Sequence, residues 1–186
     1  AEKFDNIQQS YNEKRFTEST IMIDKILVHA PDHQKSLQLQ SQLKQKYHQA
    51  EQFYAEIKQG IESENETLKQ LLELLKHAMN IYPDHPAGIM VQLKILNLSK
   101  LYKLSVKKGN EAIQNQNWLW ALQFFEQAHK IEPGSGILKV KIEHLKQIQQ
   151  MRHEIDTNIK LGDFEKAKRL AHLTDFIITE IRSSDS

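Results

Sequence analysis

The stretch from Gly109 to Pro133 reads GNEAIQNQNWLWALQFFEQAHKIEP, and it is the clearest indication of how the chain folds. Its second half carries apolar residues at steps of three and four, which is the period of an α-helix with one buried face. Asn117 precedes that half at the position of a helix N-cap, and Pro133 ends it. The stretch therefore predicts the end of one helix, a short turn and a second helix.

The same pattern recurs at three other places in the chain. An aromatic residue or Leu begins a helical segment at Phe16, Leu68, Trp118 and Phe164, and a Pro stands 15 residues after each of the first three. The spacings between these starts are 52, 50 and 46 residues. Self-similarity of this kind is the sequence signature of stacked helical repeats. Such repeats commonly serve as binding surfaces, so the pattern favours a binding function over catalysis.

Composition agrees with an all-α fold. The 186 residues include only 6 Gly and 4 Pro, so few helix breakers are present, and no alternating pattern typical of strands is sustained. The chain has no Cys, which excludes disulfides and thiolate metal sites, and its formal net charge is +1. Its apolar runs are too short for a membrane span. We expect a cytoplasmic protein, with the periplasm left open, and the non-Met start favours a processed or excised chain.

Breakers and caps place the helices. We expect one domain over residues 1–182, with repeats at 1–31, 33–83, 85–133 and 135–182, and a disordered tail at 183–186. Ser63-x-x-Glu66 resembles a capping box and predicts a helix start near residue 64. The segment 34–60 lacks any breaker and predicts one long helix. The segment 87–115 is apolar on two sides, which predicts a central helix covered on both. The expected helices span 4–12, 16–29, 34–60, 64–82, 87–115, 118–131, 137–161 and 164–181.

Gly109, Trp118, Ala121, Phe125, Ala128 and Pro133 fall at the spacings of a tetratricopeptide repeat, and the chain resembles that family over most of its length. The resemblance implies stacked antiparallel helical hairpins in an α-solenoid, with both Trp118 and Trp120 in the core. The family period is about 34 residues. The longer spacings here therefore predict unusually long first helices. The later repeats also resemble the repeat domains of bacterial receiver-containing response regulators.

This resemblance implies a non-enzymatic module that binds a peptide or helix of another protein. The alternatives are the output domain of a response regulator and an RNA-binding helical repeat; a homodimer is left open. Residues of the first helices are the candidate contacts, and the family's carboxylate clamp is matched only at Asn110. The candidate partner-binding residues are Gln8, Lys100, Lys103, Lys107, Asn110, Gln114, Arg152, Asp156 and Lys160.

Three of these candidates, Lys100, Lys103 and Lys107, share one helix face in a stretch without acidic residues. They would suit an acidic peptide or a phosphate backbone, although a solvated helix face is the simpler interpretation and nucleic acid is not favoured. The nine His residues form no zinc-binding pattern, and no nucleophile, base and oxyanion donor can be combined. We therefore expect no metal, no cofactor and no catalytic site, and interpret the His residues as solvated or helix-capping.

Overall fold

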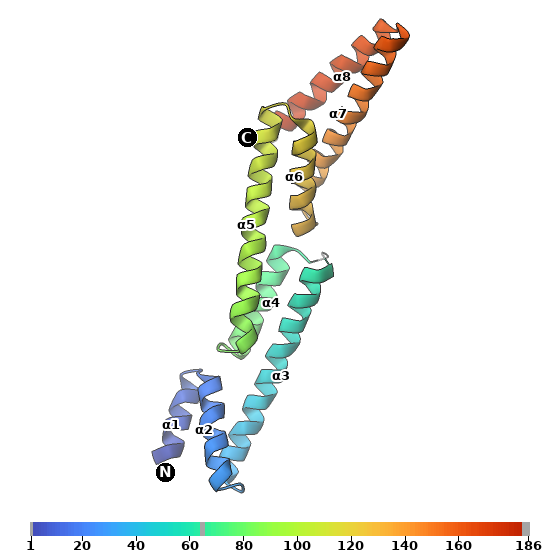
Figure 1. The fold of residues 1–186 in the computed structure, drawn as a ribbon. Helices are drawn as coiled ribbons and strands as arrows, with labels where there is room; N and C mark the ends of the chain where they lie inside the picture. Colours follow the sequence, from blue (N-terminus) through green and yellow to red (C-terminus); the bar gives the residue numbers. More distant parts are fainter. Residues whose placement is uncertain (1, 64–65, 184–186) are drawn as a thin grey trace. The chain divides into compact units, whose positions relative to one another are not determined.

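The structure, a computed structural model, describes residues 2–63 and 66–183. The described residues form eight α-helices and no strand, which confirms the all-α prediction (Figure 1). The helices are α1 (Glu2–Asn12), α2 (Phe16–His29), α3 (Gln34–Ser63), α4 (Leu68–Ile81), α5 (Pro86–Gln114), α6 (Trp118–Ile131), α7 (Gly136–Leu161) and α8 (Phe164–Ser183). Three of the first helices of the expected hairpins, α3, α5 and α7, are long and unbroken.

The chain divides into two compact units, Ala1–Asn97 and Leu98–Ser186. The first contains α1 to α4 and the N-terminal part of α5. The second contains the remainder of α5 and the helices α6 to α8. Each unit has its own apolar core, one that includes Ile23, Leu43 and Ile57 and one that includes Phe125, Leu145 and Ile148.

In the first unit, α3 is the organising helix. Its N-terminal half lies beside α2 and its C-terminal half beside α4 (Figure 1). The buried residues Leu43, Ala50, Tyr54 and Ile57 recur along one face at helical spacing, because one side must cover both partners. The prediction of a single long helix here is confirmed.

Side-chain caps recur at equivalent positions before the second helix of the last three hairpins. The N–H groups of Gln70, Trp120 and Lys166 donate to the side chains of Thr67, Asn117 and Asp163, which lie before α4, α6 and α8. The expected helix start near residue 64 is wrong: Ser63 is the last residue of α3, and α4 begins at Leu68. The capping box is instead formed by Thr67 and Gln70, a Thr-x-x-Gln pair that satisfies the same backbone groups.

In the second unit, small residues let helices approach closely. Ala121 and Ala128 on α6 are fully buried, as the repeat pattern predicts. Gly109 on α5 faces the ring of Phe125, and a Cβ atom at this Gly would lie 2.6 Å from the ring. The α5–α6 pair therefore depends on the absence of a side chain at position 109.

Two burial predictions are wrong. The apolar residues Ile89, Leu93 and Leu96 on α5 are exposed, so this helix is not covered on both sides. Trp120 is 54% exposed and contacts Phe124 on its own helix, whereas Trp118 is buried as predicted. In both cases apolar spacing identified the helix correctly, but a helix can carry more apolar residues than its neighbours cover.

The predicted tail falls mostly outside the described part of the chain. Ser183 ends α8, and residues 184–186 lie outside the described residues. None of the described helices combines the length and apolar composition that crossing a bilayer requires.

Candidate functional site

The predicted partner-binding residues lie on first helices, and all except the half-buried Asn110 are exposed. Gln8 on α1 donates to Asn12 one turn later. Lys100, Lys103 and Lys107 lie exposed on α5, as predicted, and Lys107 forms an ion pair with Glu111. Gln114 lies at the end of α5, and Arg152, Asp156 and Lys160 follow one another along α7. Arg152 also borders a shallow depression at the turn that holds Asn115 and Asn117.

Asn110 has a structural contact. Its side-chain oxygen accepts a hydrogen bond from Nζ of Lys141 on α7, at 3.3 Å. Lys141 is only 4% exposed, and its Nζ also lies 5.2 Å from the centre of the Phe125 ring. Asn110 therefore helps to accommodate a buried cation between α5, α6 and α7, a role that differs from the predicted binding role.

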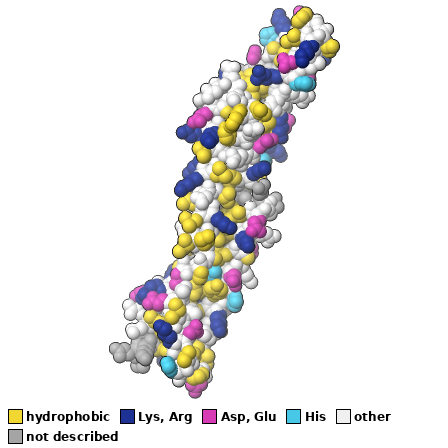
Figure 2. Space-filling model, viewed as in Figure 1, with side chains coloured by type: hydrophobic (Ala, Val, Ile, Leu, Met, Phe, Trp, Pro, Cys, Tyr) yellow, Lys and Arg dark blue, Asp and Glu magenta, His cyan; other side chains and the backbone are white. Residues whose placement is uncertain are grey.

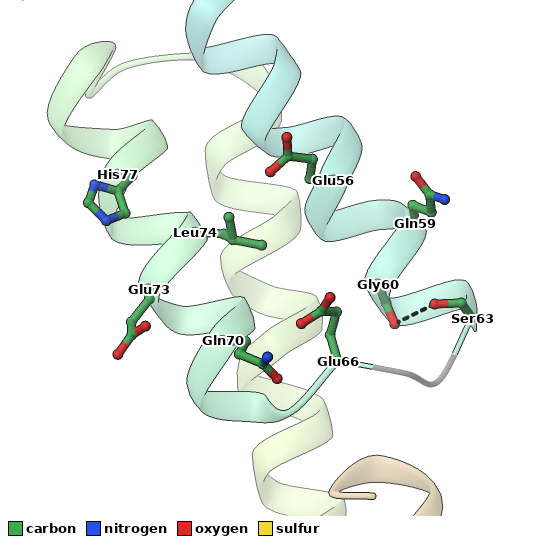
Figure 3. A pocket seen from close by; sticks show the side chains of 9 residues that line it. All are labelled: Glu56, Gln59, Gly60, Ser63, Glu66, Gln70, Glu73, Leu74 and His77. Carbon is green, nitrogen blue, oxygen red and sulfur yellow. Dashed lines mark hydrogen bonds between the residues drawn. The ribbon is translucent and has the colours of Figure 1, made fainter. Parts of the chain in front are cut away.

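A polar cavity of ≈ 610 Å³ lies between α3 and α4. Its walls carry Glu56, Glu66 and Glu73, and Figure 3 shows that Glu73 points away from the other two. His77 stacks on the ring of Phe53 at 6.0 Å. Since the acidic groups do not converge, this cavity offers no metal site, and no group of three or more potential ligands for a metal exists among the described residues.

A second cavity, of ≈ 550 Å³, lies between α3 and the start of α5, and we call it the His85 cavity. His85 ends the turn after α4, and Pro86 follows as the first residue of α5. Proline lacks a backbone N–H, but the first residue of a helix has no helical acceptor for that group, so nothing is lost. The Nδ1 atom of His85 accepts a hydrogen bond from the backbone N–H of Ala87 at 3.1 Å. His85 is thus a capping histidine, as the sequence suggested for this residue type.

The imidazole of His85 is enclosed by tyrosine rings. Its centre lies 4.4 Å from that of Tyr47 and 4.8 Å from that of Tyr54, both on α3. These tyrosines are two helical turns apart, or roughly 10 Å along the axis, so the imidazole lies between them. Tyr82 meets the same imidazole edge-on at 5.7 Å.

Two polar atoms of this cluster are buried without a hydrogen-bond partner among the described residues, His85 Nε2 and the Tyr54 hydroxyl. Each residue is only 5% exposed. Because Nδ1 of His85 accepts from a backbone N–H, the neutral imidazole carries its proton on Nε2. Burial lowers the pKa of His85, although Glu51 and Asp84 oppose this, and burial raises the pKa of Tyr54. At neutral pH both side chains are therefore uncharged hydrogen-bond donors.

The other residues that line the His85 cavity are apolar or charged, and the charged ones are equally divided between acidic and basic. Met90 and Val91 of α5 form an apolar wall. The lining also includes four charged residues, the acidic Glu51 and Glu62 and the basic Lys58 and Lys94. The lining therefore carries two charges of each sign and no net charge that would attract an anion or a cation.

No protein-family model, curated protein or solved structure matches this chain. The resemblance to tetratricopeptide repeats therefore stays an expectation based on residue spacing.

The His85 cavity was not predicted, although the sequence contains a signal for it. Pro-Asp-His occurs twice, at Pro31-Asp32-His33 and at Pro83-Asp84-His85. Both His residues cap the following helix, since the N–H of Ser36 donates to His33 Nδ1 as that of Ala87 does to His85. The repeated tripeptide marks the turn, but only the structure shows that the second copy lies between two tyrosines.

Proposed function

We propose that this protein is a non-enzymatic helical-repeat module that binds a helix or an extended segment of another protein. The observation that supports this most directly is the apolar face of α5. Ile89 is 70% exposed, and Met90, Leu93 and Leu96 are also exposed. They recur at steps that place them along one side of the helix, and Met90 also lines the His85 cavity.

An exposed apolar face of this kind favours a protein partner. Single exposed apolar residues are common, but contiguous ones beside a cavity are typical of interaction sites. Figure 2 shows hydrophobic side chains at the surface, with charged side chains scattered among them. The face lies on a first helix, where repeat proteins of the type proposed here present their binding surface. An amphipathic helix would bury its apolar side on this face.

The alternative of RNA binding has weaker support. Lys107 is paired with Glu111, which reduces the positive potential of the predicted basic face. Trp120 is exposed and is available for stacking, but no described contact brings a lysine onto its ring; Lys108 lies instead over Phe124. The apolar face of α5 has no role in binding a phosphate backbone.

Site-specific photo-crosslinking tests the proposal. A benzophenone amino acid replaces Leu93 in the full chain, expressed in its source cells, and the masses of adducts are measured. Leu119 on α6 and Leu161 on α7 are matched controls, because both are exposed leucines on other helices. We expect a discrete protein adduct at position 93 that is absent at 119 and 161. Adding Ile89→Glu should abolish this adduct.

Three outcomes would contradict the proposal. Adducts at the control positions but not at 93 would move the interface elsewhere. An adduct sensitive to ribonuclease would support the RNA alternative. An adduct with twice the mass of the chain would identify a second copy of the same chain as the partner.

A further inference from the structure

The buried polar atoms of the His85 cavity lead beyond a general binding face. A buried donor without a partner destabilises the folded chain, because it has lost its hydrogen bond to water and gained none in return. His85 Nε2 and the Tyr54 hydroxyl are two such donors; the rings of their residues are in contact, and both residues belong to the lining of one cavity. A structure that keeps two of them together is suited to a ligand that supplies the missing acceptor.

We propose that the His85 cavity is a binding subsite for an uncharged amide carbonyl carried on an apolar group. His85 and Tyr54 donate to the carbonyl oxygen, and Met90, Val91 and the ring of Tyr47 contact the apolar part. This inference rests on the proposed function for its source of ligand, which is an amide of the partner segment bound along α5.

The chemistry of the lining selects this class of ligand. Both available groups can donate, so the ligand must present an acceptor. The charged residues of the lining balance one another, so a carboxylate gains no advantage over a neutral carbonyl. The remaining walls are aromatic and aliphatic, which favours an apolar neighbour to the amide.

Access requires a local movement. The two polar atoms are almost completely covered. Tyr54 is packed closely, since a Cβ atom at Gly88 would lie 2.9 Å from its hydroxyl oxygen, so the α5 backbone cannot move nearer. Met90 is the unbranched apolar residue of the lining and is 63% exposed, so a change of its rotamer is the movement we infer.

A set of four small probes tests the subsite on the full chain. Benzamide has a neutral carbonyl, benzoate an anionic acceptor, benzylamine a cationic donor, and toluene no polar group. Binding is followed by the NMR signals of the His85 imidazole, with dissociation constants from titration. We expect benzamide to bind about tenfold more tightly than toluene, with benzoate and benzylamine weaker than benzamide.

Two variants remove the donors one at a time. Tyr54→Phe keeps the ring and removes only the hydroxyl, and His85→Asn keeps a cap for α5 while removing the Nε2 donor. For Tyr54→Phe the benzamide contact is observed through the His85 imidazole, and for His85→Asn through the tyrosine ring signals. Each variant should weaken benzamide binding about threefold to tenfold and leave toluene binding unchanged. Tyr11→Phe is the matched control, since Tyr11 is a tyrosine of the same unit that does not line the cavity.

Several results would overturn the inference. Equal binding of benzamide and toluene would show that the donors do not act, as would unchanged benzamide binding in Tyr54→Phe. Tighter binding of benzoate would exclude a neutral ligand. If no probe binds, the two donors either hydrogen-bond to a buried water molecule or stay unpaired at a cost to stability, and the cavity is not an amide subsite. If the adduct at position 93 persists in Tyr54→Phe without loss, the proposed function stands and the amide subsite falls.

Discussion

The carboxylate of Asp84 accepts a hydrogen bond from the backbone N–H of Thr17, 67 residues earlier in the chain, at 2.9 Å. The N–H of Phe16 donates to the other carboxylate oxygen at 3.2 Å. Both donors belong to the first turn of α2. Arg15 holds the N-cap position of this helix but makes no side-chain cap, whereas Thr67, Asn117 and Asp163 cap the equivalent helices. Asp84 therefore replaces a missing local cap from a distant turn.

Asp84→Ala should lower the free energy of unfolding of the first unit by about 0.5–2 kcal/mol, because two N–H groups of α2 lose their acceptor. Asp84→Asn keeps one acceptor oxygen and should cost less. Chemical denaturation followed by circular dichroism measures both. Asp32→Ala is the matched control, since Asp32 occupies the same place in the other Pro-Asp-His turn and is exposed. Equal losses for Asp84→Ala and Asp32→Ala would show that the long-range cap contributes nothing.

Gly109→Ala should destabilise the second unit by about 1–3 kcal/mol, because three atoms of the buried Phe125 ring lie within 3 Å of the new methyl group. This loss outweighs the gain in helix propensity of roughly 1 kcal/mol from replacing Gly. Gly136→Ala is the control, since nothing lies within 4 Å of its Cβ position and it also stands in a helix. Thermal denaturation should show a lower melting temperature for the first variant only. An unchanged melt for Gly109→Ala would mean that α5 and α6 separate easily.

His85 should make stability depend on pH. Burial lowers the pKa of its imidazole in the folded chain, so the unfolded chain binds the proton first as the pH falls. The neutral His85 imidazole therefore contributes fully to the free energy of unfolding above about pH 6.5, the unfolded-state pKa. This contribution declines as the pH falls below that value, and it stops changing below the folded-state pKa. His85→Asn removes this titration but keeps the cap on α5. Urea denaturation at a series of pH values should show a shallower decline for the variant. Parallel curves for the two proteins would contradict the assignment.

The sequence predicted secondary structure better than burial. Seven of the helices begin within two residues of the expected position, because Pro, Gly and capping residues act locally. The exception, α4, begins after Thr67 rather than Ser63 because two nearby segments both matched a capping box and only one satisfied the backbone. The long helix α3 was predictable for the same local reason, the absence of any breaker.

The candidate site was harder to predict, because it depends on contacts between distant residues. His85 is distant in the sequence from Tyr47 and Tyr54, and each residue has an ordinary structural role when it is considered alone. Only the packing of α3 against the start of α5 brings them together. In the same way, nothing in the sequence shows that Asn110 meets Lys141 or that one apolar side of α5 remains exposed.

The last prediction concerns the lysines of α5. Replacing Lys100, Lys103 and Lys107 together by Glu should change the free energy of unfolding by no more than about 1 kcal/mol, because all three are exposed and, among the described residues, only Lys107 of the three forms an ion pair, with Glu111. The helical circular dichroism should be intact. In the crosslinking experiment the adduct at position 93 should persist in this variant, since the proposed contact is apolar. Loss of the adduct, together with weaker binding of the partner as salt is added to the unsubstituted protein, would show instead that the partner is acidic and docks on the basic face.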